Sequence, residues 1–197
     1  MFIHILPLLV GTFLNIISSV KVSERAEHLL INPYSPLPDI IHCNIPPMPV
    51  VIPDYFLFIS ICIALFNYKY LINVEKNLVC IGLCSIIRSF SVWLTIMPTC
   101  MPQPISNSID NIKKLNKIGK LTYLYKKCFH STHDLMFSGH TLFFIFIGNI
   151  LNNNFIKVVG PCLLVISRQH YTIDVCVSGL VYSLIYSHYN SNINLFF

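Results

Sequence analysis

Apolar residues gather in six runs along this chain, and polar segments separate the runs. About 18 or more largely uncharged apolar residues are enough for a helix to cross a membrane, and the runs approach or reach that length. The pattern predicts an all-α membrane protein, a six-transmembrane helical bundle. The expected spans cover residues 2–20, 50–68, 78–97, 135–151, 155–167 and 172–188.

The two shortest runs have polar residues at their starts. The fourth run opens with polar residues, and the fifth follows Asn152, Asn153 and Asn154. The first run has an alternative interpretation as a cleaved signal peptide, although it is long for the apolar region of such a peptide and no basic residue precedes it. We expect residues 1–197 to form a single integral membrane domain.

Composition supports a membrane protein, because 54% of the 197 residues are hydrophobic and only 11% are charged. Soluble domains carry roughly 25% charged residues. The expected partners are membrane lipids, with no nucleic acid, and a homo-oligomer is left open.

The eight cysteines form no CxxC pair, so they are interpreted as buried apolar side chains, with one bridge among Cys43, Cys100 and Cys128 left open. No metal or other cofactor is expected.

The loops between the runs divide into long and short ones, and the long loops share one side of a six-span bundle. A proline-rich loop over residues 32–53 is expected at the surface or re-entrant, with a stiff linker as the alternative. A lysine-rich loop over residues 98–134 forms a solvated face or attracts anionic headgroups. Lys and Arg are more numerous in the long loops, so the positive-inside rule places that side in the cytosol.

Four ionisable residues lie within the apolar runs, where an unpaired charge is costly. They are Asp54, Arg88, His140 and Asp174. His170 stands just before the last run, one helical turn ahead of Asp174. The carboxylate can therefore accept a hydrogen bond from the imidazole, fix its tautomer and raise its basicity.

These residues supply the groups that phosphoryl transfer needs. His170 can attack phosphorus to form a phosphohistidine, and His140 can give a proton to the leaving alkoxide. Ser138 and the helix start beside it favour a bound phosphate, and Asp134 can orient His140 or bind a polar headgroup. Each histidine alone is more often an interfacial polar group, but the two motifs together provide a nucleophile, an acid and an orienting carboxylate.

Four segments, in order, resemble the sphingomyelin synthase family, whose members share the wider lipid phosphate phosphatase (PAP2) fold. The segments are YSPLPDIIH after the first run, RSFSVWLTIMPTCMPQP at the end of the third, DLMFSGHT at the start of the fourth and HYTIDV at the start of the sixth. The resemblance implies a catalytic triad of His140, His170 and Asp174. It also implies transfer of a phospho-headgroup from a phospholipid to ceramide, with His170 as nucleophile and release of diacylglycerol.

The same resemblance implies roles in substrate binding. Asp39 and Tyr34 are expected to shape the entrance to the site. Arg88 can offer its planar guanidinium to a phosphate, while snorkelling or pairing with Asp54 is the structural alternative. The expected substrate-binding residues are Asp134, Ser138, Arg88, Asp39 and Tyr171.

Departures from the family pattern bear on the headgroup. Thr132 and His133 stand where many members have Cys-Gly, and Gln169 stands where animal members often have an acidic residue. The SRQH segment looks closer to relatives that make inositol phosphorylceramide. Phosphocholine is the first expectation for the transferred group, and phosphoinositol and phosphoethanolamine are the alternatives.

Two other functions fit parts of the pattern. A hydrolase of the same fold, of the phospholipase C or lipid phosphatase type, would use water in place of ceramide. A non-catalytic lipid-binding or transport protein would not need the triad. The family's active side faces the Golgi lumen or the cell exterior, so we expect a multi-pass protein of the Golgi, endoplasmic reticulum or plasma membrane with a lumenal or exoplasmic site, against the positive-inside rule.

Overall fold

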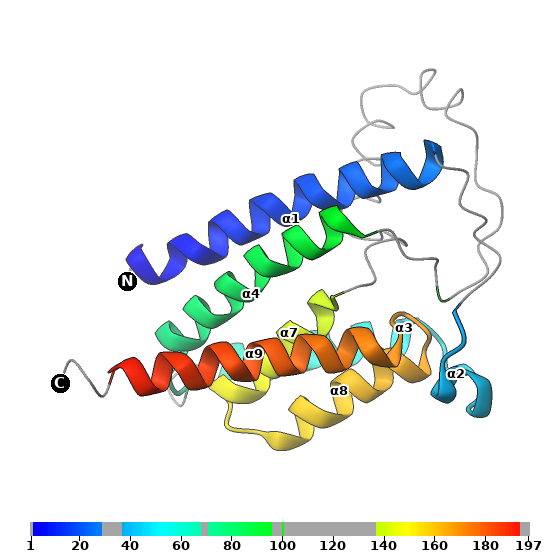
Figure 1. The fold of residues 1–197 in the computed structure, drawn as a ribbon. Coiled ribbons are helices and arrows are strands. Elements are labelled where there is room, and N and C mark those ends of the chain that lie inside the picture. Colours follow the sequence, from blue (N-terminus) through cyan, green and yellow to red (C-terminus); the bar gives the residue numbers. More distant parts are fainter. Residues whose placement is uncertain (1, 29–36, 68–70, 96–99, 101–136, 194–197) are drawn as a thin grey trace, which may run out of the picture.

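The computed structural model describes residues 2–28, 37–67, 71–95, 100 and 137–193 (Figure 1). This part of the chain is helical and contains no strand. Its helices are α1 (Phe2–His28), α2 (Ile40–Asn44), α3 (Val51–Phe66), α4 (Val74–Leu94), α7 (Gly139–Ile150), α8 (Asn154–Ile166) and α9 (Thr172–Ile193). The prediction of an all-α chain is therefore confirmed for the described residues.

Each expected span corresponds to one helix, but the lengths differ from those predicted. α1 continues to His28, well past the expected end at residue 20, whereas α7 has 12 residues and α8 has 13. Among the described residues, two helices are long and apolar enough to cross a membrane, over His4–Val22 and Val74–Leu94. α3, α7 and α8 are shorter apolar helices. At about 1.5 Å per residue, α7 is about 18 Å long, against about 30 Å for a hydrocarbon core.

The short lengths of α7 and α8 follow from the turns that end them. Asn152 and Arg168 have left-handed backbones, with φ of 51° and 58°. At the end of α7, the N–H of Asn152 donates to the carbonyl of Asn149, and the N–H of Asn153 donates to the carbonyl of Gly148. At the end of α8, the N–H of Arg168 donates to the carbonyl of Val165, and the N–H of Gln169 donates to the carbonyl of Leu164. This is the Schellman pattern of helix termination. The second turn reverses the chain between the end of α8 and His170.

α1 and α4 lie side by side (Figure 1), and two glycines allow their close contact. A Cβ on Gly82 would lie 2.5 Å from the backbone nitrogen of Leu8, and one on Gly11 would lie 2.6 Å from Cβ of Ser85. Small residues of this kind let helices approach closely inside a membrane. α7 contacts α3, α4, α8 and α9, so it holds the remaining helices together.

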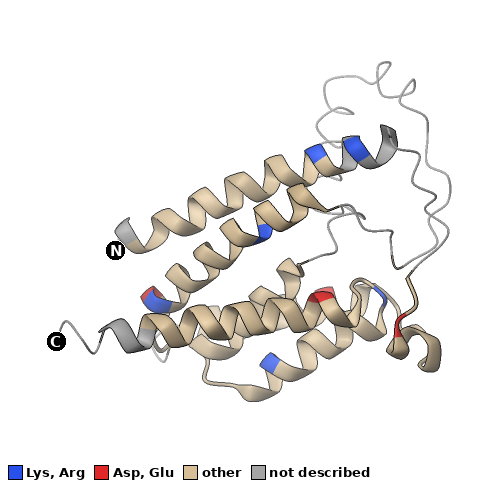
Figure 2. Cartoon of the chain, in the orientation of Figure 1, with Lys and Arg blue, Asp and Glu red and all other residues tan. Residues whose placement is uncertain are grey.

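The outer surface of the bundle is largely uncharged. Figure 2 shows charged residues mainly near the ends of the helices, with long uncharged stretches between them. Inside, Phe144 of α7 is fully buried and packs against Gly160 of α8. A buried hydrogen bond of 2.6 Å from the Tyr182 hydroxyl to Asn77 joins α9 to α4. An apolar exterior around a hydrogen-bonded interior agrees with the membrane association that the two long apolar helices indicate.

The described part of the proline-rich loop, from Leu37 onward, contains α2 and packs on the turn between α8 and α9. Its hydrogen bonds to that turn run from the Met48 N–H to the Ile166 carbonyl (3.2 Å), from Arg168 to the His42 carbonyl (2.9 Å) and from Gln169 to the Val50 carbonyl (2.6 Å). The segment therefore supports the turn that precedes His170. Of the lysine-rich loop, only Cys100 lies among the described residues.

Candidate active site

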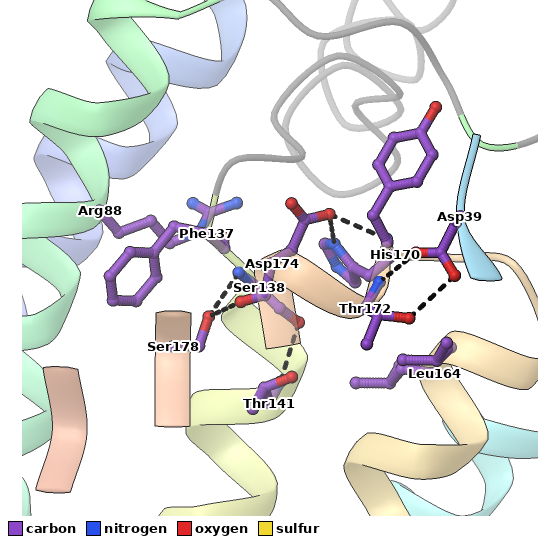
Figure 3. Close-up of polar contacts among 12 residues, drawn as sticks. Asp39, Arg88, Phe137, Ser138, Thr141, Leu164, His170, Thr172, Asp174 and Ser178 are labelled. Atoms are coloured by element: carbon purple, nitrogen blue, oxygen red, sulfur yellow. Dashed lines mark hydrogen bonds and ion pairs between the residues drawn. The ribbon is translucent and has the colours of Figure 1, made fainter. Parts of the chain in front are cut away.

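His170 and Asp174 lie one turn apart at the start of α9 (Figure 3). Nδ1 of His170 is 3.6 Å from Oδ2 of Asp174, and the two side chains are 7% and 1% exposed. The same oxygen accepts the N–H of Tyr171 at 2.9 Å, as a carboxylate in the first turn of a helix does when it caps the helix. This capping bond holds the carboxylate beside the imidazole. The spacing of four thus correctly predicts that the two side chains are close, but at 3.6 Å the expected hydrogen bond between them is not formed.

His140 lies in the first turn of α7 and approaches His170. The centroids of the two rings are 6.3 Å apart, and the ring planes meet at 55°. Nε2 of His140 is also 3.7 Å from Oδ1 of Asp54 in α3. Their side chains are 40% and 50% exposed, so this pair is far more open than His170 and Asp174. The structure thus brings the three expected triad residues together and adds a second carboxylate.

A serine of α9 ties the two histidine motifs to each other. The N–H of Ser138 donates to Oγ of Ser178 at 2.7 Å, and that hydroxyl donates to the carbonyl of Asp174, also at 2.7 Å (Figure 3). The hydroxyl of Ser138 caps α7 by accepting the N–H of Thr141 at 3.1 Å. Ser138 is fully buried. These contacts give Ser138, which the sequence places among the substrate-binding residues, a part in positioning His140.

Arg88 extends from α4 to the start of α7. Its Nε donates to the carbonyl of Phe137 at 2.9 Å, and its Nη1 donates to Asn15 of α1 at 2.7 Å. The guanidinium lies 3.5 Å from the point where a Cβ of Gly139 would stand. A positive charge is therefore fixed beside the N-terminus of α7, and both features attract a phosphate. Asp54, the alternative partner of Arg88, lies against His140 instead.

Asp39 joins the starts of α2 and α9. It caps its own helix by accepting the N–H groups of Ile41 (2.9 Å) and His42 (3.3 Å). It also accepts the N–H (2.7 Å) and the hydroxyl (2.9 Å) of Thr172. Burial disfavours the ionised form, but the hydrogen bonds outweigh burial and hold the pKa of Asp39 below its ordinary value. The carboxylate of Asp39 thus positions the start of α9, close to the site whose entrance this residue is expected to shape.

Tyr171 is buried at the same junction. Its hydroxyl accepts the N–H of Leu37 at 2.9 Å, and its ring lies 5.7 Å from the ring of His42. Burial raises the pKa of Tyr171 to about 12, so the phenol stays protonated at neutral pH. The side chain, expected to bind substrate, is 2% exposed and anchors the proline-rich segment beside His170.

Four buried side-chain atoms of the described residues have no hydrogen-bond partner. They are Oγ1 of Thr141, Nε of Arg168, Nδ1 of His170 and Oδ1 of Asp174. Buried polar atoms are usually satisfied, and the exceptions are candidates for functional atoms. Thr141 follows His140 directly in the FSGHT motif, and this position was the available signal for it.

Other parts of the expected site stay untested by the geometry. Asp134 and Tyr34 lie outside the described residues. Among the residues that are described, no group of three or more His, Cys, Asp or Glu side chains could hold a metal ion. Asp54 was recognised in the sequence as an ionisable residue in an apolar run, but no local spacing could link it to His140, because the two residues lie on helices far apart in the chain.

A buried histidine held by a carboxylate, beside a second histidine and an arginine at a helix N-terminus, offers the nucleophile, the proton donor and the cation that phosphoryl transfer uses. No protein-family model matches the chain, and no curated protein matches it. The assignment of function therefore depends on the chemistry of the site and on the four motifs.

Proposed function

We propose that this chain is a multi-pass membrane phosphotransferase of the sphingomyelin synthase type. It transfers a phospho-headgroup, phosphocholine in the first instance, from a glycerophospholipid to ceramide and releases diacylglycerol. The observation that carries the proposal is the buried pair of His170 and Asp174, at 3.6 Å, with the ring of His140 6.3 Å from that of His170. A lipid-binding protein has no need for such an arrangement of two histidines and a carboxylate.

In the first half-reaction, Nε2 of His170 attacks the phosphorus of the donor, because Nδ1 is turned toward Asp174. The bond between phosphorus and the diacylglycerol oxygen breaks, and His140 gives that oxygen a proton. The phosphoryl group stays on His170 as a phosphohistidine. Arg88 and the N-terminus of α7 offset the negative charge on the phosphoryl oxygens.

In the second half-reaction, His140, now neutral, takes the proton of the primary hydroxyl of ceramide. The hydroxyl oxygen attacks the phosphorus, the phosphorus–nitrogen bond breaks, and His170 is regenerated as the phosphorylated ceramide leaves. Asp54 stabilises the protonated form of His140 that results, because its carboxylate lies 3.7 Å from Nε2. The covalent intermediate predicts ping-pong kinetics.

The proposed topology is a six-span bundle with the site on the lumenal or exoplasmic side. α7 and α8 are too short to cross a hydrocarbon core of about 30 Å by themselves. We therefore expect the polar start of α7, with His140 and its neighbours, to lie within the membrane thickness. Non-helical backbone at such a depth is tolerated where protein surrounds it, and the buried residues Phe137 and Ser138 satisfy that condition.

The headgroup question turns partly on the segment before His170. Arg168 donates to the carbonyl of His42, and Gln169 donates to the carbonyl of Val50. Both side chains that suggested an inositol headgroup are thus bound to the proline-rich segment. Phosphocholine is the first donor to test, with phosphoinositol and phosphoethanolamine as the competing donors.

The test is a transfer assay in liposomes that hold the purified protein, a fluorescent ceramide and one of phosphatidylcholine, phosphatidylethanolamine or phosphatidylinositol. We expect a phosphorylated ceramide from the wild type and none from His170→Ala. His4→Ala serves as the matched control, because His4 contacts Glu75 near the far end of α1. Diacylglycerol release without a ceramide product would make the protein a hydrolase. An unchanged product yield in His170→Ala would refute the mechanism.

A further inference from the structure

A hollow of about 370 Å³ lies on the surface of α3 and, among the described residues, is lined by that helix alone. The lining residues are Val51, Asp54, Tyr55 and Phe58, which share one face of the helix because they are three, four and seven residues apart. The three apolar side chains are largely exposed, at 54% for Val51, 66% for Tyr55 and 63% for Phe58. The hollow is thus an apolar groove with one carboxylate in its wall. We call it the α3 groove.

Asp54 connects the α3 groove to the reacting groups. Its carboxylate lines the groove and also lies 3.7 Å from Nε2 of His140. The side chain is half exposed, so one carboxylate can meet both His140 and an occupant of the groove. A molecule lying along α3 with a polar end at Asp54 would present that end to the proton-transferring histidine.

Two charged groups near His140 indicate which molecules can bind there. Arg88 lies at Gly139, beside the N-terminus of α7, and this positive charge suits a phosphate. Asp54 lies at His140 itself, where its carboxylate repels a phosphate and accepts a hydrogen bond from a hydroxyl or an amide. A phosphodiester donor therefore suits Arg88, and an uncharged alcohol suits Asp54 and the α3 groove.

We propose that the α3 groove binds the acceptor lipid, an uncharged long-chain alcohol, with its reacting hydroxyl at Asp54 and His140 and its chain along Tyr55 and Phe58. This inference rests on the proposed transferase function. It assigns the acceptor a binding surface separate from that of the donor, and it makes Asp54 the residue that aligns the acceptor hydroxyl with His140.

The experiment compares two substitutions of the same kind on one helix. Phe58→Ala removes an aromatic wall of the groove, while Phe66→Ala removes an 87% exposed phenylalanine two turns further along α3. Loss of one aromatic packing partner corresponds to about a three- to tenfold weaker interaction. With ceramide as acceptor, we expect the acceptor KM of Phe58→Ala to rise by about that factor. The donor KM should change less than the acceptor KM, and Phe66→Ala should match the wild type.

A photoaffinity measurement provides a readout that does not depend on turnover. A ceramide analogue with a diazirine in its chain is irradiated in liposomes with the wild-type protein, and the labelled peptide is identified by mass spectrometry. We expect labelling within residues 51–58, removed by excess ceramide. A second hollow, of about 340 Å³, lies between α2 and the start of α9, and its lining includes Leu37, Ile40 and Ile173. Labelling there in place of α3 would overturn the inference.

The outcomes separate the two proposals. If the wild type makes no phosphorylated ceramide, the transferase function fails and the acceptor groove fails with it. If the wild type transfers the headgroup but Phe58→Ala and Phe66→Ala have equal acceptor KM values, the transferase stands and the groove is refuted. Equal thermal melting temperatures of the two variants in detergent would exclude a folding defect as the cause of a difference.

Discussion

The carboxylate of Asp39 accepts both hydrogen bonds that Thr172 can donate, from its backbone N–H at 2.7 Å and from its hydroxyl at 2.9 Å. Thr172 is the first residue of α9, two residues after His170. The proline-rich segment therefore fixes the position and direction of the helix that presents the proposed nucleophile. A residue of the PLPD motif can then govern the reaction without touching the substrate.

A double-mutant cycle tests this positioning role. We expect Asp39→Ala and Thr172→Val each to lower kcat more than they raise the donor KM, because they misplace His170. Thr172→Val removes only the hydroxyl bond, whereas Asp39→Ala also removes the bonds to the N–H of Thr172 and to the start of α2. The double variant should therefore be little worse than Asp39→Ala alone, with a coupling energy of about 0.5–3 kcal/mol. Thr172→Ser, which keeps the hydroxyl, should retain most activity. Independent, additive losses would show that the two residues act separately.

The stability of the fold should depend on pH through Asp39. Its pKa in the folded protein lies below the ordinary value of 3.8, so its contribution to stability is complete above that pH and is lost as the pH falls through the lower folded value. We expect the difference in melting temperature between wild type and Asp39→Asn to shrink as the pH is lowered below 3.8. Thermal unfolding in detergent over a pH series measures this, and a difference that grows in acid would contradict it.

Arg88 should be sensitive even to replacement by lysine. Its Nε and Nη1 hydrogen bonds join α4 to Phe137 and to Asn15 of α1, and a lysine cannot reproduce this forked geometry. Hydrogen bonds to charged groups contribute about 1.5–3 kcal/mol each, so we expect Arg88→Lys to lower the free energy of unfolding by about that amount and to slow transfer.

The matched control for that substitution is Arg25→Lys. Arg25 also donates from Nη1 to a carbonyl, that of Trp93, at 2.8 Å, but the contact is exposed to solvent. Exposed contacts of charged side chains contribute about 0–1 kcal/mol. Unfolding in a denaturant series should therefore separate the two arginine variants clearly, and equal losses would argue against a special role for Arg88.

The contact of α1 with α4 should not tolerate a single methyl group. In Gly82→Ala the new Cβ would meet the backbone of Pro7 and Leu8 at 2.6 and 2.5 Å, and backbone atoms cannot rotate away. Overpacking of this kind costs about 1–3 kcal/mol. In Gly179→Ala the nearest atom would be the Ile145 side chain at 3.8 Å, an ordinary contact. We expect a lower melting temperature for the first variant and no loss for the second.

Local features of the fold were accessible from the sequence because they depend on neighbouring residues. The spacing of four predicted the pairing of His170 with Asp174, and the apolar runs predicted the helices. The expected first span, residues 2–20, lies close to the apolar stretch His4–Val22, but the helix itself continues to His28, through the polar residues that follow. A change from apolar to polar residues marks the edge of a possible membrane span, which need not be the end of the helix.

Contacts between distant segments could not be predicted from spacing. The approach of Asp54 to His140, the bridge from Ser138 through Ser178 and the capping of α9 by Asp39 each join helices whose relative positions depend on the packed bundle. Arg88 illustrates the same limit. Its charge in an apolar run marked it as important, but two of its partners, the carbonyl of Phe137 and the side chain of Asn15, are uncharged groups that no charge pattern in the sequence could reveal.

The placement of His170 just before α9 and of Asp174 in its first turn, late in the chain, has a consequence for biosynthesis. A chain emerging from the ribosome contains Asp54, Arg88 and His140 before it contains His170 and Asp174. The groups that would hold the phosphate and transfer protons thus enter the membrane ahead of the group that would attack it. During its own insertion the nascent protein would be chemically silent toward the surrounding lipids, and it would become reactive only when α9 docks beside α7.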